Sequence, residues 1–132
     1  GPTRQVPDND ELAAASAAVL LYGSTPLGRH AEVLGVFDKR HDESNGRYVY
    51  DHRYEQDIGM WHTKGRWHVG PKQCIGEPRS WLSAADSAAV PEWIGKKAKW
   101  ECVCGLADSQ ATLRVTKDRK QCELDCDCGK GW

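Results

Sequence analysis

The chain has 132 residues, a length typical of one domain. Apolar residues make up 39% of it, and six Trp, four Tyr and one Phe provide much of the large apolar surface available to a core. The 18 Lys and Arg nearly balance the 19 Asp and Glu, so the net charge of −1 favours neither nucleic acid nor an acidic membrane surface as a partner. The longest apolar run, residues 17–22, is too short to span a bilayer.

The first part of the chain predicts a tail followed by a helix. Residues 1–9 contain two prolines and no apolar periodicity, which is typical of a flexible tail, and Gly1-Pro2 resembles the scar left by a tag-removing protease. We expect residues 10–132 to form a single β domain. The alanine-rich stretch at its start predicts a short helix over 10–18, because Ala has the highest helix propensity. A short strand over 19–22 should follow.

After Pro26 the chain becomes a series of short segments separated by turn residues at intervals of about ten, which is typical of antiparallel sheets. No segment exceeds about six residues, and most alternate between apolar and polar residues, which predicts one dry and one wet face. The fold class predicted is mostly β: an antiparallel β-sandwich or barrel-like meander with a short N-terminal helix. The predicted strands are 33–37, 47–51, 60–63, 66–69, 80–82, 99–104, 112–116 and 121–125.

Two tight turns are predicted from local sequence. Asn45-Gly46 separates two alternating runs and has the strongest signature of a two-residue hairpin loop. Lys64-Gly65 predicts a second such loop, with glycine supplying the positive φ. Its register would pair Thr63 with Arg66, His62 with Trp67, Trp61 with His68 and Met60 with Val69, so that each face of the hairpin has one Trp and one His.

Between residues 19 and 100 the sequence resembles a β module. The signature is an Asn-Gly-Arg-x-x-Tyr strand starting at Asn45 and a Gly-x-Trp-x-Val-Gly strand starting at Gly65. Modules of this kind occur, often repeated, in large multidomain proteins of algae and other protists and of some marine invertebrates. The resemblance implies an accessory binding or scaffolding module with neighbouring domains in the same chain, and it implies no catalytic residues. The cysteines lie outside this pattern.

Six cysteines, five of them within the last 31 residues, indicate a stabilised C-terminal hairpin over 102–128. An even count in a domain with a small core favours up to three disulfides, although fifteen pairings are possible. Disulfides would favour an extracellular or secretory compartment. The candidate disulfide or metal residues are Cys74, Cys102, Cys104, Cys122, Cys126 and Cys128.

Zinc is the alternative use of these thiols, and it would make the protein a zinc-stabilised intracellular interaction domain. Four thiolates in a tetrahedron suit zinc, and the spacing from Cys122 to Cys126 is that of a structural site. The two C-x-C pairs do not have this spacing. We therefore predict no cofactor, with zinc as the alternative.

A catalytic function is the weaker alternative. Asp51-His52 is a carboxylate beside an imidazole, the pair that a small hydrolase would need. No serine has the context of an activated nucleophile, and the chain lacks nucleotide-binding and metalloprotease motifs.

The surplus of aromatic residues points instead to recognition. Flat rings beside polar side chains suit a sugar ring or a peptide, since the rings stack and the polar groups fix orientation. We therefore predict a non-catalytic module that binds a protein partner or a glycan through exposed aromatics. The predicted ligand-binding residues are Tyr48, Tyr50, Tyr54, Trp61, His62 and Trp93.

Overall fold

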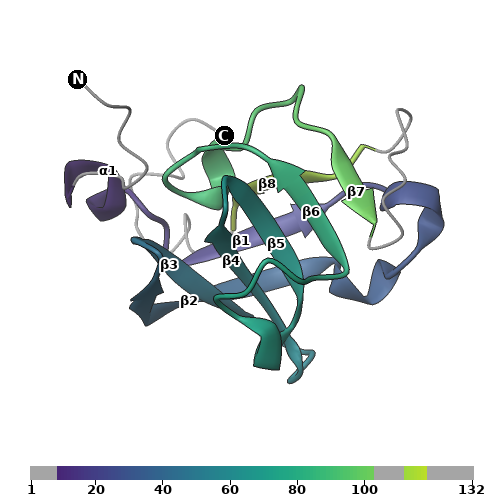
Figure 1. The fold of residues 1–132 in the computed structure, drawn as a ribbon, viewed down its shortest axis with the longest axis horizontal. Coiled ribbons are helices and arrows are strands. Elements are labelled where there is room, and N and C mark those ends of the chain that lie inside the picture. Colours follow the sequence, from purple (N-terminus) through teal and green to yellow (C-terminus); the bar gives the residue numbers. More distant parts are fainter. Residues whose placement is uncertain (1–8, 103–111, 119–132) are drawn as a thin grey trace.

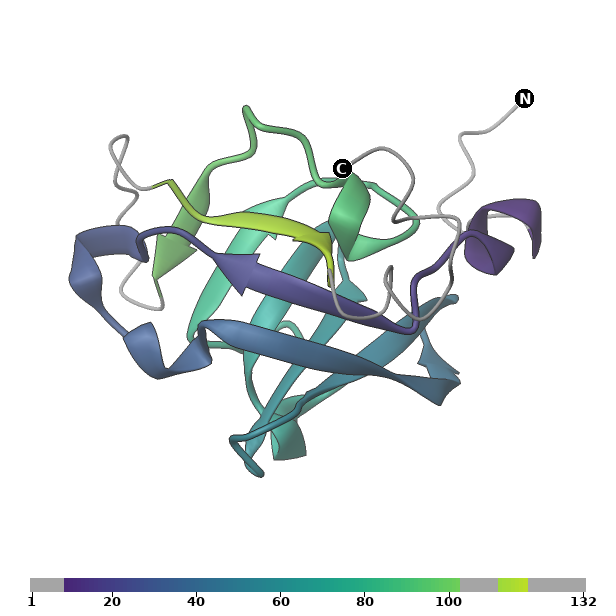
Figure 2. The same cartoon turned by 180° about the vertical axis from the view of Figure 1, so that it is seen from behind.

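The computed structural model describes residues 9–102 and 112–118, which build one antiparallel sheet (Figure 1). Its eight strands have the order β7-β6-β5-β4-β3-β2-β1-β8, and the sheet curls into a half-barrel (Figures 1 and 2). Trp100 of β7 and Val115 of β8 therefore share one core, although their strands stand at opposite ends of the order. The strands are β1 (Ala18–Tyr22), β2 (Gly35–Ser44), β3 (Arg47–His52), β4 (Ile58–Thr63), β5 (Arg66–Pro71), β6 (Leu82–Ala85), β7 (Trp100–Cys102) and β8 (Arg114–Lys117).

The predicted mostly antiparallel β fold with a short N-terminal helix is confirmed. The helix, α1 (Asn9–Ala13), is shorter than predicted and buries only Leu12. An alanine-rich stretch has high helix propensity but little apolar surface to pack, and short helices depend on packing for their stability. From Ala18 onward the chain joins the sheet instead, where Val19 and Leu21 are fully buried.

The β4–β5 hairpin has the predicted register. Strand β4 pairs Met60, Trp61, His62 and Thr63 with Val69, His68, Trp67 and Arg66. The loop residues Lys64 and Gly65 have φ angles of 53° and 77°, the left-handed conformation that a two-residue hairpin loop of this type needs. The hairpin thus places His62 with Trp67 on one face and Trp61 with His68 on the other.

Strand β2 differs from its prediction. It begins at Gly35, because residues 31–33 form a 3-10 turn, and it extends for ten residues rather than about six. Its pairing with β3 slips between Lys39 and Glu43 before the predicted Asn45-Gly46 turn, where φ is 57° and 82°. The far half of β2 is largely exposed, so its pairing with β3 rather than burial extends the strand beyond its apolar residues.

The prediction of one dry and one wet face is wrong for β4, in which every residue is buried. Met60 packs in the half-barrel core, while Trp61 on the opposite face is also fully buried. The segment that follows β5 covers this outer face: the Trp61 indole N–H donates to the Glu77 carbonyl at 2.8 Å. Added burial of this kind is possible because β4 lies in the middle of the sheet.

Three polar side chains hold the segment that follows β6. The Arg47 guanidinium donates to the carbonyls of Ser87 and Ala88 at 2.8 and 3.0 Å. The Trp67 indole donates to the same Ala88 carbonyl, and the His62 imidazole bonds the Asp86 carbonyl at 2.9 Å. These bonds satisfy polar groups that burial would otherwise leave unpaired.

Several predictions fall beyond the described ranges. The part of the chain outside the described ranges holds the tail predicted over 1–9 except Asn9, which begins α1, the strand over 121–125, most of the hairpin over 102–128, and Cys104, Cys122, Cys126 and Cys128. Within residues 9–102 and 112–118, no helix is long and apolar enough to cross a membrane.

Candidate binding groove

The six predicted ligand-binding residues do not form one exposed surface. Tyr50, Trp61 and His62 are buried, so their side chains belong to the packed interior rather than to a binding face. Of the other three, Tyr54 is 70% exposed and Trp93 49% exposed, on the turn after β3 and on the 3-10 turn η4 (Pro91–Trp93) respectively. Tyr48 is half-buried, and the Lys39 ammonium lies 4.3 Å from its ring centre.

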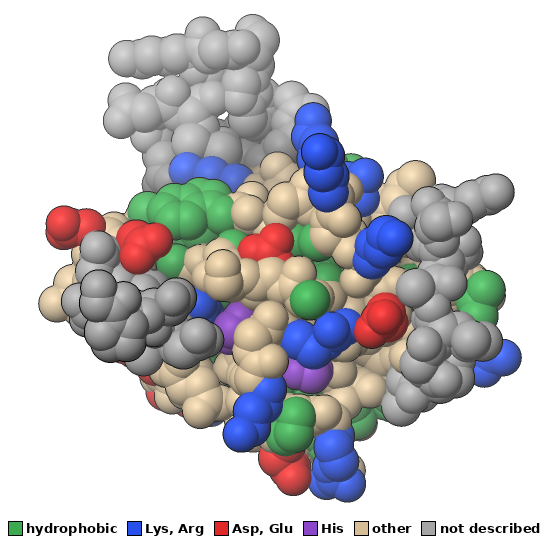
Figure 3. All heavy atoms as spheres, turned by 45° about the horizontal axis from the view of Figure 1, so that its top comes forward, with side chains coloured by type: hydrophobic (Ala, Val, Ile, Leu, Met, Phe, Trp, Pro, Cys, Tyr) green, Lys and Arg blue, Asp and Glu red, His purple; other side chains and the backbone are tan. Residues whose placement is uncertain are grey.

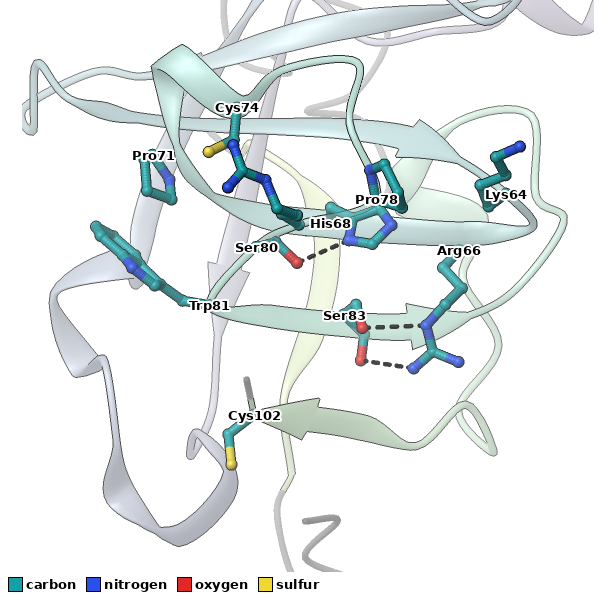
Figure 4. A pocket seen from close by; sticks show the side chains of 11 residues that line it. Lys64, Arg66, His68, Pro71, Cys74, Pro78, Ser80, Trp81, Ser83 and Cys102 are labelled. Carbon is teal, nitrogen blue, oxygen red and sulfur yellow. Dashed lines mark hydrogen bonds between the residues drawn. The ribbon is translucent and has the colours of Figure 1, made fainter. Parts of the chain in front are cut away.

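A groove of about 500 Å³ lies instead over the outer face of β5 and β6 (Figure 4). Ligand pockets commonly have volumes of ~300–1,000 Å³, so the groove has the size of a small-ligand site. Its lining includes aromatic, proline, cationic and hydroxyl side chains. The segment that buries Trp61, residues 72–80, also provides one wall of this groove.

One end of the groove is formed by rings. Figure 4 places Trp81 and Pro71 together at this end. The Trp81 ring is stacked on the His30 imidazole, with ring centres 5.2 Å apart and planes 2° from parallel. This stack holds the indole in a fixed orientation, which reduces the conformational entropy lost when a ligand packs on it.

Trp81 reaches this position because β5 carries a glycine beside it. A Cβ at Gly70 would lie 2.9 Å from the Trp81 backbone nitrogen and 3.0 Å from the Ser80 Cα. The absence of a side chain lets the Trp81 N–H donate to the Val69 carbonyl at 3.1 Å. Close backbone approach of this kind is a recognised use of glycine within a strand.

Cationic side chains line the opposite end, where Figure 4 shows Arg66 and Lys64. Arg66 is held by its sheet neighbours: its Nε donates to the Ser83 hydroxyl at 3.1 Å, and its Nη2 donates to Glu101 at 2.7 Å. Arg79, a third cation of the lining, is 72% exposed along its side chain and lies 3.4 Å from Glu77.

The floor of the groove contains a buried imidazole. His68 Nδ1 lies 2.7 Å from the Ser80 Oγ, and this hydroxyl donates in turn to the Leu82 carbonyl at 3.0 Å. Both bonds form together when Nδ1 carries the proton, so the imidazole donates to the serine and does not activate it as a base. Burial lowers the pKa of His68, which keeps the floor uncharged at neutral pH.

The two described cysteines also line this groove. Cys74 is a half-buried free thiol. The prediction of up to three disulfides stays a prediction, because Cys104, Cys122, Cys126 and Cys128 lie outside the described residues. Cys102 is buried, and its sulfur points away from His68 and Ser80 in Figure 4.

No cluster of three or more His, Cys, Asp or Glu suited to a metal ion occurs among residues 9–102 and 112–118. The four thiols of the zinc hypothesis fall mainly beyond these ranges, so zinc remains a prediction.

The Asp51 carboxylate and the His52 imidazole have separate partners and do not form the carboxylate–imidazole pair of the hydrolase hypothesis. His52 Nε2 donates to the Leu34 carbonyl at 3.0 Å, while Nδ1 accepts the N–H groups of Tyr54 and Glu55. Both ring nitrogens are therefore occupied by backbone groups, and the Asp51 carboxylate faces Arg40 and Lys72 at 3.7 Å instead. His52 has no free nitrogen for the acid–base role that the hydrolase hypothesis requires.

A second hollow, of about 660 Å³, lies between the tips of the β2–β3 and β4–β5 hairpins. Two of its three buried polar residues, Arg47 and His62, already bond the carbonyls of residues 86–88. Their positions are explained by these bonds, so this hollow gives a weaker case for a ligand site.

Sequence reasoning misses the groove because the strand predicted over 80–82 does not show that the Trp81 ring lies at a surface, and because Arg66 is considered only for its pairing with Thr63. The predicted hairpin register already placed Arg66 on the same face as His68, which was a usable signal. No such signal exists for His30, which reaches Trp81 from a segment about fifty residues earlier. No family model, curated protein or solved structure matches this chain.

Proposed function

We propose that the protein is a non-catalytic recognition module that binds a glycan or protein partner in the groove over β5 and β6. The main support for this proposal is that the groove has a fixed Trp81 ring at one end and the cations Arg66 and Lys64 at the other. A flat ring gives contact area, and directional cations fix the orientation of a polar ligand.

The proposal as a binding module also rests on the resemblance to repeated β modules, which are accessory units of larger proteins. Neighbouring domains in the same chain are part of this proposal. An enzymatic use is less well supported, because the groove's His68 donates to Ser80 and the Asp51-His52 pair is separated.

The site is tested by combining binding arrays with chemical-shift mapping. Arrays of neutral, carboxylated and sulfated oligosaccharides and of peptides identify binders, and each binder is then titrated into ¹⁵N-labelled protein. We expect the largest shifts at the Trp81 indole and the amides of β5 and β6.

Trp81→Ala should abolish binding, whereas Trp93→Ala, which removes an exposed ring outside the groove, should leave binding unchanged. A far-UV circular dichroism melt of each variant confirms that it is folded. Binders that shift residues elsewhere, or the absence of any binder in both arrays, would contradict the proposed function.

A further inference from the structure

The charge on the groove's lining points to the chemistry of its ligand. Lys64, Arg66 and Arg79 line it, and no Asp or Glu is among the described lining residues. On the face shown in Figure 3, Lys and Arg are interspersed with Asp and Glu, and no broad field of one sign covers it. The groove is a local exception to the near-neutral balance of the whole chain.

We propose that this groove selects an acidic glycan, one with carboxylate or sulfate groups, and that these groups replace Glu101 and Glu77 on Arg66 and Arg79. The inference rests on the proposed function, because it assigns a ligand class to the same site. The step is an exchange of ion-pair partners and involves no covalent change.

Both existing ion pairs are suited to exchange. Glu101 and Glu77 are 40% and 48% exposed along their side chains, so water solvates them readily once they are released. Exposed pairs contribute little to stability; Arg66 and Glu101 lie 2.7 Å apart, whereas the 3.4 Å distance from Arg79 to Glu77 is longer than a strong charge-assisted bond. The guanidinium of Arg66 keeps its bond to Ser83 during the exchange and so stays oriented.

A peptide is a poorer fit because the floor offers no free backbone. Strand β5 is paired with both β4 and β6, and β6 is paired with both β5 and β7. Extended peptides gain much of their affinity by adding a strand to an open sheet edge, and neither β5 nor β6 has an open edge. A glycan relies instead on ring stacking and on hydrogen bonds from side chains, and those are the groups that line the groove.

The layout of the groove also matches a chain of sugar rings with attached anions. Trp81 lies at one end and the cations Lys64 and Arg66 at the other (Figure 4). One ring can stack on the indole while the acidic group of a neighbouring ring meets a guanidinium, which donates hydrogen bonds to two oxygens at once.

The experiment uses isothermal titration calorimetry of the full chain with four probes of matched length: an oligouronate, a sulfated oligosaccharide, a neutral oligosaccharide and an oligoglutamate peptide. Binding of either acidic glycan in preference to both other probes supports the inference. Comparison of the oligouronate with the sulfated probe shows which anion the groove takes.

Charge reversal at exposed positions tests the site without disturbing the core. The double variant Lys64→Glu/Arg79→Glu should weaken binding of the acidic glycan by about tenfold or more, since a hydrogen bond to a charged group contributes ~1.5–3 kcal/mol. Arg40→Glu is the matched control, because Arg40 is a partly exposed cation outside the groove, and it should leave binding unchanged.

Different results would overturn the acidic ligand and the recognition site itself. Equal affinity for the neutral oligosaccharide, with loss of binding in Trp81→Ala but not in the charge-reversed variant, would overturn the acidic ligand and keep the recognition site. Preference for oligoglutamate would overturn the assignment of a glycan as the ligand. No binding of any of the four probes, together with no binder in the arrays, would overturn both the ligand class and the proposed function.

Discussion

The two faces of the β4–β5 hairpin carry the same residue types in different surroundings. On the inner face, His62 and Trp67 meet edge to face, with ring centres 5.2 Å apart, and both bond carbonyls of the segment after β6. On the outer face, Trp61 and His68 stack 5.7 Å apart beneath the groove. The segment that covers each Trp-His pair therefore determines whether the pair lies in the core or beneath a groove.

Removing the inner aromatic should have the largest effect. Trp67 is fully buried in the core, so Trp67→Ala should lower the free energy of unfolding by about 3–5 kcal/mol. Urea unfolding followed by circular dichroism measures this loss. Trp81→Ala on the outer face should have a distinctly smaller effect because Trp81 is only half-buried, and equal losses would remove the distinction between the faces.

Acid should destabilise both faces through their histidines. Burial lowers the pKa of His62 from 6.5 to about 4, and it lowers the pKa of His68 as well. Between pH 6.5 and about 4 the unfolded chain therefore binds more protons than the folded one. The stability that the neutral imidazoles contribute is fully present above pH 6.5 and is lost as the pH falls toward 4.

The melting temperature measured across this pH range reports the effect. His62→Gln should flatten the pH dependence in part, with the remainder contributed by His68. A variant that retains the full slope would show that His62 is not kept neutral by burial.

A methyl group at Gly70 should act on the outer face alone. Gly70→Ala places a Cβ against the backbone of residues 80–81, which must shift, and overpacking of this kind costs about 1–3 kcal/mol. Chemical-shift changes should extend from β5 to the Trp81 indole and leave the Trp67 indole in place. Gly95→Ala, whose added Cβ comes no closer than 3.7 Å to a neighbouring atom and whose φ lies outside the left-handed range, is a control for the loss of a glycine itself.

Arg66 should contribute little to stability but measurably to binding. Its side chain is 30% exposed and that of its partner Glu101 is 40% exposed, so Arg66→Gln should change the unfolding free energy by about 1 kcal/mol. The same variant should measurably weaken binding of the acidic glycan, as determined by calorimetry. A large loss of stability would identify Arg66 as part of the fold rather than of the site.

The sequence was most informative where neighbouring residues determine the structure. The two hairpin turns follow from Asn45-Gly46 and Lys64-Gly65, and the β4–β5 pairing follows from the second turn because a two-residue loop leaves one register. Strand ends away from tight turns were less predictable: β6 begins at Leu82 rather than at residue 80, since residues 80–81 are drawn against Gly70.

The candidate site was largely unpredictable from the chain alone. Aromatic residues such as Trp61 could be identified as important, but whether a ring is buried depends on a cover that arrives from another segment, here residues 72–80. The stack of His30 on Trp81 and the bond from Arg66 to Glu101 join residues distant in sequence. Local propensity contains no information on such pairs.

The sequence by itself therefore determined the β class, the turns and the division of the hairpin residues between two faces, because these depend on short-range geometry with a period of two. Only the tertiary structure decided which face became core and which became groove. The reason is physical: the curl of the sheet and the path of the covering segments set the water exposure of each side chain. Exposure, rather than residue type, separates the buried Trp67 from the groove-lining Trp81.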